Sequence, residues 1–476
     1  MYQVLFQASL DQGIVPPDWK EANVVPLFKK GDKTSPENYR PISLTSLSCK
    51  ILEHVVHSTL MSHFDKYNVL DNAQHGFRKN RSCVSQLIAT LDDFANALKK
   101  RKQMDAILLD FSKAFDKVDH EGLILKLEHL GIRGPLLDWI RSFLIGRKQR
   151  VVVDGVASPP TDVLSGVPQG TVLGPLFFLV YINDISKGLS EGTKLNLFAD
   201  DSLLYREINT PEDSAILQKD LETLQIWEKK WKMEFHPGKC QLLRITNKKN
   251  PITSPYFIHG IPISETDSAK YLGVIIDSTL NFRQQYASMI KKCNSTLSFI
   301  RRNLNKAPKY VKEKCYTTLV RPSIEYASPV WDPHHQIHKE NIEKVQKRAA
   351  RFVTGNYKME TGNSKRNLDN LNWPPLEERR LKTKLTLFQK ARLKLIDIPT
   401  DHLEFQKRQT RRGGDGLNYQ RVFSNIDAHF NSFYPQATHL WNQLPSDVKE
   451  CQDINIFSSK VNNINLMALK QKSSYN

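Results

Sequence analysis

The sequence has few cysteines and no long run of apolar residues. Its six cysteines are scattered through 476 residues with no close pair (Cys49, Cys83, Cys240, Cys293, Cys315 and Cys451). This spacing offers neither a zinc module nor a disulfide framework, and it suits a reducing compartment. No apolar run reaches the roughly 18 residues of a membrane span. The N-terminus also lacks a basic region followed by an apolar core, so we expect neither a membrane segment nor a secretory signal.

Acidic residues are scarce relative to basic ones. The chain has 68 Lys and Arg against 50 Asp and Glu, which gives a formal net charge of +18. A hydrophobic content of 40% and an aromatic content of 9% are typical of a globular protein rather than a disordered one. The basic excess favours a polyanionic partner, with nucleic acid ahead of an anionic membrane. The alternative is a soluble protein that is merely basic.

Basic residues gather in two stretches of the second half. Nine Lys or Arg and one acid lie between Tyr286 and Arg321, on a largely helical pattern. Seven basic residues and no acid lie between Arg379 and Lys394. Charge runs are usually solvated faces, but repeated runs on so basic a chain favour a track for nucleic acid.

Two acidic sites interrupt apolar runs. The segment 195–205 (LNLFADDSLLY) runs from apolar residues into Asp200 and Asp201 and back into apolar residues. This pattern predicts two short strands joined by a tight turn, with the acids at or beside its tip. Earlier in the chain, the apolar residues 106–109 predict a buried strand that ends at Asp110. For either site alone, an ordinary turn rich in aspartate is the alternative, because aspartate is a common turn residue.

The three acids together suggest metal chemistry. If the two strands lie side by side, Asp110, Asp200 and Asp201 converge. Hard divalent cations prefer such oxygen ligands, and Mg²⁺ keeps water and substrate phosphates in its other positions. Two ions about 3.5–4 Å apart can activate an attacking hydroxyl and stabilise a leaving oxygen. This arrangement serves phosphoryl transfer by a polymerase or a nuclease.

Four motifs resemble those of reverse transcriptases. The segment 107–116 (ILLDFSKAFD) resembles the first palm motif, 165–170 (SGVPQG) the next, and 198–201 (FADD) the third. The segment 38–44 (NYRPISL) is similar to the fingers of non-LTR retrotransposon enzymes of the jockey-like and CR1-like LINE group. The ordered resemblance covers roughly residues 15 to 280, and the basic segment to about 355 resembles that group's thumb.

The resemblance implies an α+β right-hand polymerase with a ferredoxin-like palm, fingers and a helical thumb. We expect residues 1–280 to form fingers and palm, 281–355 the thumb, and 356–476 a basic, mostly helical C-terminal extension. We also expect the Gly-rich segment 411–414 to be a linker and residues 271–277 to form one strand. Residues 74–82 (QHGFRKNRS) are expected to form a basic loop.

Roles for individual residues follow from the resemblance alone. Asp110, Asp200, Asp201 and the main-chain carbonyl of Phe111 would hold two Mg²⁺ ions, with Mn²⁺ as an alternative. Phe115 would lie under the incoming sugar and exclude a 2′-hydroxyl. The remaining nucleotide-binding positions would be Gln169 and Gly170 beside the nascent base pair, and Arg40, Lys29 and Lys239 at the phosphates.

The implied reaction is RNA-templated DNA synthesis from dNTPs onto a DNA primer. The family copies its RNA at nicked chromosomal DNA, so the resemblance implies action in the nucleus after synthesis in the cytoplasm. We expect this chain to be the polymerase part of a longer element protein, without the group's N-terminal endonuclease. Two alternatives remain: a degenerate or domesticated copy that binds nucleic acid without catalysis, and a two-metal nuclease.

Overall fold

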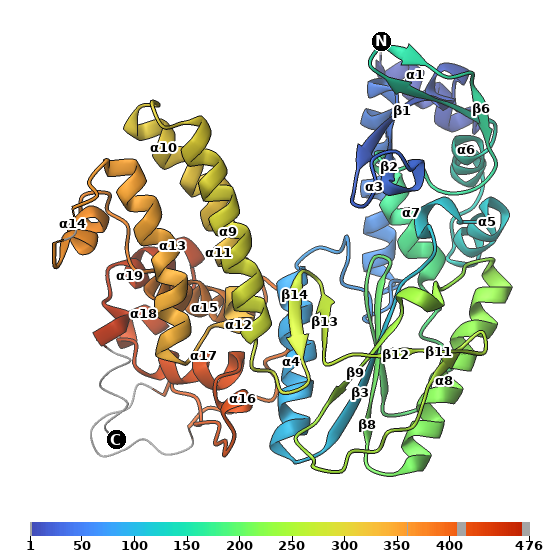
Figure 1. The fold of residues 1–476 in the computed structure, drawn as a ribbon. Coiled ribbons are helices and arrows are strands. Elements are labelled where there is room, and N and C mark those ends of the chain that lie inside the picture. The colour runs from blue at the N-terminus through green and yellow to red at the C-terminus, as the bar shows by residue number, and fades with distance from the viewer. Residues whose placement is uncertain (1, 359, 407–415, 469–476) are drawn as a thin grey trace.

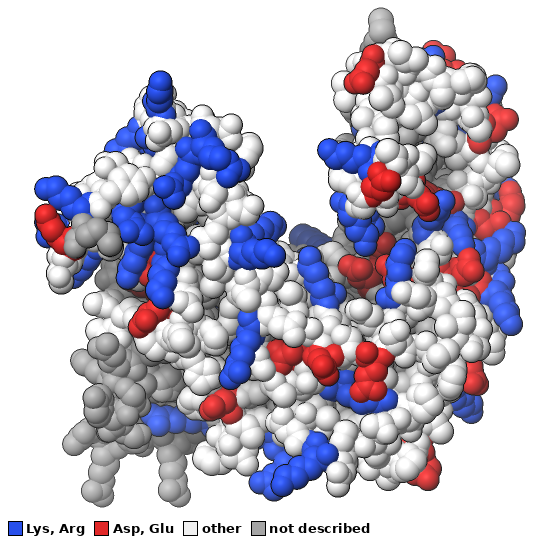
Figure 2. All heavy atoms as spheres, in the orientation of Figure 1, with Lys and Arg blue, Asp and Glu red and all other residues white. Residues whose placement is uncertain are grey.

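The chain forms two lobes (Figure 1), and the space-filling view shows a broad hollow between them (Figure 2). The computed structural model describes residues 2–358, 360–406 and 416–468, and Figure 1 shows helices α9 and α10 on one side of the hollow and the N-terminal half on the other. The linker expected at 411–414 lies outside the described residues. Within the described ranges, no helix combines the length and apolar character that crossing a bilayer would require.

A five-stranded sheet with the order β12-β9-β3-β8-β7 carries the acids singled out above. Its strands are β3 (Gln103–Leu109), β7 (Thr193–Phe198), β8 (Asp201–Ile208), β9 (Gln241–Ile245) and β12 (Ser264–Glu265). Strand β3 pairs antiparallel with both β8 and β9, and β7 pairs antiparallel with β8. Helices follow β3 and β8, so the chain has the βαββαβ pattern of a ferredoxin-like fold. The expected palm is therefore confirmed.

Strand β3 is buried on both faces because its apolar residues point alternately to two cores. Met104 and Ala106 join one core with helix α4, whereas Ile107 and Leu109 join the other. The helices around this sheet are α4 (Cys83–Lys99), α5 (His120–His129), α7 (Leu173–Ile182) and α8 (Pro211–Trp231). A strand covered on both sides has little freedom to shift. The position of Asp110, which follows β3, is therefore well fixed.

The fingers form a second sheet. Strand β1 pairs with β2 and β4, and β4 also pairs with β5 and β6. The elements of this region are α1 (Tyr2–Gln12), α2 (Pro17–Lys20), β1 (Glu21–Phe28), η1 (Pro36–Asn38), β2 (Tyr39–Leu44), α3 (Leu47–Lys66), α6 (Pro135–Leu144), β4 (Arg147–Val153), β5 (Val156–Ala157) and β6 (Thr161–Val163). Residues 147–163, which follow the first palm strand in sequence, thus complete the fingers sheet.

The second lobe is helical and shares one core with the palm. Its elements are α9 (Arg283–Asn303), α10 (Lys309–Cys315), η4 (Tyr316–Val320), α11 (Arg321–Glu325), α12 (Ser328–Trp331), α13 (Gln336–Thr354), α14 (Asn363–Asp369), α15 (Leu376–Arg392), α16 (Asp427–Phe430), α17 (Phe433–Asn442), α18 (Ser446–Lys449) and α19 (Ile454–Asn462). Phe94 of α4, Trp331 of α12 and Trp441 of α17 belong to the same buried cluster. The C-terminal helices therefore pack against both the thumb and the palm.

The prediction of one strand over residues 271–277 is wrong. The structure has a hairpin there, with β13 (Ser268–Tyr271) antiparallel to β14 (Val274–Asp277). Leu272 and Gly273 form its turn with φ angles of +44° and +83°, as a two-residue turn between twisted strands requires. The continuous apolar run hid the turn, because leucine rarely adopts a positive φ. Short strands β10 (Phe257–Ile258) and β11 (Ile261–Pro262) form another hairpin nearby.

The palm sheet contains one buried ion pair whose loss should be costly. Asp105 of β3 is fully buried, and Arg244 of β9 donates to its Oδ2 at 2.6 Å. We expect Arg244→Met to lower the free energy of unfolding by about 3–5 kcal/mol, because an unpaired carboxylate would remain in the core. Urea denaturation followed by fluorescence measures this change. Lys194→Met, which breaks the exposed pair with Asp93, should cost less than about 1 kcal/mol; equal effects would contradict the prediction.

Candidate active site

The predicted acidic turn joins β7 to β8. Phe198 pairs with Asp201, so Ala199 and Asp200 are the two central residues of a tight turn. Ala199 has a φ of +55°, in the left-handed region that a hairpin turn usually fills with glycine. Asp200 therefore lies at the tip and Asp201 begins β8, which confirms the expected pair of strands.

Strand pairing brings Asp110 to the same place. Leu109 is paired with Ser202, so Asp110, the next residue, continues past the start of β8 beside the turn. Burial is the main cause that raises the pKa of Asp200, and the charge of Asp110 raises it further. Burial, followed by the charges of Asp200 and Asp110, raises the pKa of Asp201 to about 6. The three carboxylates thus repel one another at one end of the sheet.

Cations lie around these acids without neutralising all of them. Lys239 places Nζ 3.3 Å from Oδ2 of Asp110. From the fingers side, the charges of Arg40 and Lys29 partly offset the rise in the pKa of Asp200. In the part of the chain that the structure describes, no Lys or Arg forms an ion pair with Asp200 or Asp201. The site therefore keeps a concentration of negative charge that a bound cation would relieve.

One cavity of about 1310 Å³ brings most of the predicted residues together. It lies between the fingers sheet and the palm, and its lining includes eight of the residues singled out from the sequence: Lys29, Arg40, Asp110, Phe111, Phe115, Gln169, Asp200 and Lys239. Asp201 and Gly170 are not on that lining. Each of these two directly follows a residue that is, so the predicted set forms a single site.

Two stacked aromatic pairs fix the segment after Asp110. The buried ring of Phe111 stacks on Phe235 with centroids 4.3 Å apart. The half-buried ring of Phe115, in η2 (Ala114–Asp116), stacks on Phe178 of α7 at 4.4 Å. The Asp110 carbonyl accepts a bond from the His236 N–H at 2.8 Å, just before η3 (Pro237–Lys239). The stacking therefore fixes the ring of Phe115, which lines the cavity.

The loop 165–170 ties the palm to the fingers. The carbonyl of Gln169 accepts a hydrogen bond from the Ser43 N–H of β2 at 2.8 Å, and its side-chain Nε2 lies 3.3 Å from Oδ1 of Asp116. Gly170 has a φ of +115°, and a Cβ there would lie 2.6 Å from the Ser43 oxygen. Glycine is required at this contact because the two backbones approach so closely.

Some cavity residues did not emerge from the sequence. Phe77 lines the cavity with its side chain more than half exposed, and its φ is +55°. Asp116 and His236 also line it. The only sequence signal for Phe77 was its place after glycine in a basic loop, which does not indicate a contact with a cavity built from distant strands.

The fold and the site together define a right-hand nucleic-acid polymerase, in which a ferredoxin-like palm carries clustered carboxylates below a fingers sheet. Residues 28–276 match the reverse transcriptase (RNA-dependent DNA polymerase) family, and this span is more than half of the chain. The protein therefore belongs to the reverse transcriptase family.

Individual relatives point to transposable elements. The chain is 31% identical to the probable RNA-directed DNA polymerase from transposon BS of Drosophila melanogaster, over 74% of this chain and 40% of the relative. It is 30% identical to the RNA-directed DNA polymerase from mobile element jockey of Drosophila funebris, over 75% and 40%. The chain thus spans about two fifths of the length of these relatives. Among solved structures, apo telomerase from Candida tropicalis aligns with a TM-score of 0.44 and 12% identity, over 83% of this chain and 70% of that one.

The close contact between Gly170 and the Ser43 carbonyl can be tested by measuring the free energy of unfolding. We expect Gly170→Ala to lower the free energy of unfolding by about 3 kcal/mol, because the added methyl group meets the Ser43 carbonyl and the φ is unfavourable for alanine. Gly260→Ala is the matched control, since its φ is +74° and nothing lies within 4 Å of the added Cβ. That variant should lose only about 1 kcal/mol. A Gly170→Ala protein as stable as Gly260→Ala would show that the two backbones do not touch.

Proposed function

We propose that this protein is the RNA-directed DNA polymerase of a non-LTR retrotransposon of the jockey-like or CR1-like group. A primer 3′-hydroxyl attacks the α-phosphate of a dNTP, a new phosphodiester bond forms, and pyrophosphate leaves. The observation that carries the proposal is the shared cavity, where Asp110 and Asp200 face Lys29 and Arg40. In a member of the reverse transcriptase family, this juxtaposition places phosphate-binding cations opposite metal-binding acids.

The donor set fits divalent metal ions. Asp110, Asp200 and the carbonyl of Phe111 supply hard oxygen ligands on one side of the cavity, with Asp201 adjoining. Among the described residues, no cluster of three or more His, Cys, Asp or Glu side chains encloses a metal by itself. Mg²⁺ is commonly held by one or two carboxylates together with water and substrate phosphates, so in this proposal the bound nucleotide would complete the coordination. Two Mg²⁺ ions, or Mn²⁺ in their place, would supply charge stabilisation at the attacking and leaving oxygens.

The other cavity residues are assigned to the nucleotide. Lys29 and Arg40 on the fingers side would hold the triphosphate, and Lys239 would act at the departing pyrophosphate, since cations stabilise the charge that develops there. Phe115 would lie under the sugar ring. Gln169, whose loop is fixed to β2 by its own carbonyl, would border the nascent base pair together with Gly170.

Nucleic acid is the partner that the surface favours. Figure 2 shows Lys and Arg side chains spread over the upper part of the helical lobe and along the hollow. Exposed cations on α9 and α10, including Arg301, Arg302 and Lys309, suit binding of phosphates. We assign an RNA template and a DNA primer or target to this hollow. By the same reasoning from the family, we propose that the protein acts in the nucleus.

Primer extension on an RNA template tests the proposed reaction. Purified full chain should extend a DNA primer in the presence of Mg²⁺, and Asp200→Asn should reduce extension at least about a hundredfold, because one carboxylate of the site is lost. Binding of the template–primer duplex should stay within about twofold, because the substitution removes no phosphate contact. Asp369→Asn, an exposed acid on α14, is the matched control and should extend normally.

The other outcomes separate the alternatives. Full extension by Asp200→Asn would rule out the assigned mechanism. Tight binding by the unmodified chain, without extension in Mg²⁺ or Mn²⁺, would identify a copy that binds nucleic acid without synthesis. Cleavage of a labelled duplex in the absence of nucleotides would favour a nuclease.

The preference for deoxynucleotides over ribonucleotides tests the role assigned to Phe115. We expect Phe115→Ala to raise incorporation of ribonucleotides relative to deoxynucleotides by about tenfold or more, because a ring that excludes the 2′-hydroxyl is removed. Competition between labelled dNTP and rNTP in single-nucleotide extension measures this ratio. Phe115→Tyr keeps the ring and should preserve the selection. An unchanged ratio in Phe115→Ala would remove the assignment.

A further inference from the structure

The basic loop that begins at Gln74 lies against the catalytic turn. Leu197 of β7 donates its N–H to the Ala73 carbonyl at 2.8 Å, and its carbonyl accepts from the His75 N–H at 2.8 Å. Residues 73–75 thus run alongside the edge of β7 at Leu197, which lies two residues before Ala199. This segment has no part in the reaction assigned above, although it touches the strand that carries Asp200.

The side chain of Gln74 reaches the turn itself. It is only 2% exposed. Its Oε1 accepts hydrogen bonds from the Ala199 N–H at 2.9 Å and from the Gly76 N–H at 2.7 Å. Ala199 is buried and has a positive φ, so its N–H would be left in the core without a partner if this oxygen were absent. A single side-chain atom therefore satisfies and restrains the residue next to Asp200.

The amide nitrogen of Gln74 indicates that this residue does not serve the global stability of the fold. Its Nε2 is buried and has no hydrogen-bond partner among the described residues. An unsatisfied buried donor costs free energy, on the order of 1–3 kcal/mol. An apolar side chain of the same length would avoid that cost but would leave the turn without its acceptor. The benefit of glutamine at this position is thus local to the turn.

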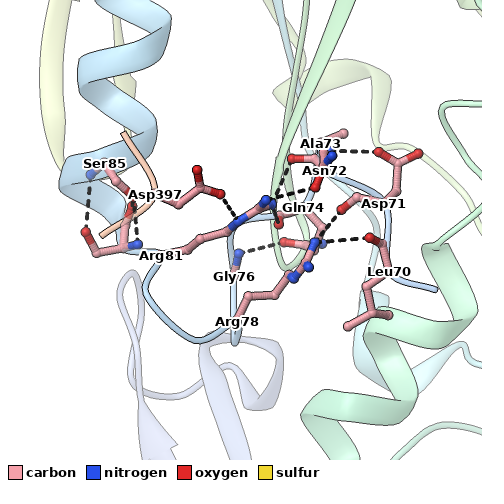
Figure 3. A network of polar contacts seen from close by, with 11 residues as sticks. Leu70, Asp71, Asn72, Ala73, Gln74, Gly76, Arg78, Arg81, Ser85 and Asp397 are labelled. Atoms are coloured by element: carbon pink, nitrogen blue, oxygen red, sulfur yellow. Dashed lines mark hydrogen bonds and ion pairs between the residues drawn. The ribbon is translucent and has the colours of Figure 1, made fainter. Parts of the chain in front are cut away.

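The backbone of the loop is also held closely against the turn. A Cβ added to Gly76 would lie 2.4 Å from the Ala199 nitrogen. Arg81 donates from Nη1 to the carbonyls of Asn72 and Gln74, at 2.9 and 2.7 Å. Figure 3 shows Arg81 reaching across this loop, with Asp397 on its other side. Nε of Arg81 lies 2.6 Å from the Asp397 carboxylate, so a residue from the C-terminal region completes the support.

We propose that Gln74 is a positioning residue that holds the strained Ala199–Asp200 turn in its working conformation. Arg81, which is paired with Asp397, donates a hydrogen bond to the Gln74 carbonyl and so restrains the backbone of Gln74. The consequence for catalysis rests on the proposed function, whereas the effect on the turn does not. Gln74 does not line the cavity and reaches the turn through its hydrogen bond from the Ala199 N–H.

Amide hydrogen exchange of the metal-free full chain tests the restraint directly. In Gln74→Met, exchange in peptides covering 195–203 should accelerate about tenfold, because the Ala199 N–H loses its acceptor. The thermal midpoint should change little, since an unsatisfied donor is removed as well. Gln103→Met is the matched control: Gln103 is fully buried at the opposite end of β3 and bonds to Ile252. It should leave exchange at 195–203 unchanged.

Two further variants keep the test decisive if Gln74→Met folds poorly. Gln74→Glu retains an oxygen acceptor and should preserve slow exchange at 195–203. Asp397→Asn, at a half-exposed site, should fold normally and accelerate exchange there about two- to fivefold, as expected for loss of a partly exposed ion pair. Unchanged exchange at 195–203 in both Gln74→Met and Asp397→Asn would overturn the proposal, as would equal acceleration in Gln103→Met.

The kinetics of primer extension test whether the restraint on the turn affects catalysis. For folded protein, Gln74→Met should lower kcat of primer extension by about ten- to a hundredfold, because small displacements of catalytic groups are costly. KM for the dNTP should change less than threefold, and Gln103→Met should keep both constants. If the unmodified chain does not extend primers, the proposed function fails while the exchange result still decides the role of Gln74. Faster exchange with unchanged kcat would overturn the catalytic part of the proposal.

Discussion

Repulsion among three carboxylates is the constraint that organises this protein. Asp110, Asp200 and Asp201 are brought together by the antiparallel register of β3, β7 and β8, and the pKa of Asp201 rises to about 6 as a result of burial and its two neighbours. Holding like charges this close costs free energy, which the stability of the surrounding structure offsets. The double-sided burial of β3 and the stacked rings of Phe111 and Phe235 supply that stability.

The same repulsion explains where the cations lie. Arg40 and Lys29 line the same cavity, and their charges partly offset the rise in the pKa of Asp200 without an ion pair to it in the described structure. A direct ion pair would neutralise the site and occupy the space of a substrate. Cations held on the fingers sheet instead leave that space open, as the proposed binding of a nucleotide with its metal ions requires. The charge distribution therefore supports the proposed polyphosphate substrate.

The sequence predicted which acids meet at the end of the sheet better than it predicted the residues that support them. Asp110 and Asp200 could be found because each acid interrupts an apolar run, and the motifs around them are local in sequence. Gln74 was placed in a basic loop only, since its hydrogen-bond partner Ala199 lies 125 residues away. The hairpin of β13 and β14 was not predicted because Leu272 adopts a positive φ that its residue type does not favour. Local patterns thus predict elements and acids, while contacts between distant segments need the tertiary structure.

The C-terminal region is connected to the Ala199–Asp200 turn as well as to the thumb. Its helices share a core with α4 of the palm, and His429 of α16 lies 3.2 Å from Asn96 of that helix. Asp397 adds a second connection through Arg81 to the carbonyl of Gln74. Because the turn contains a strained residue, its conformation depends on supports that over-determine it. The second lobe therefore helps to restrain the segment that packs against the Ala199–Asp200 turn, in addition to the role in binding nucleic acid that we propose for its cations.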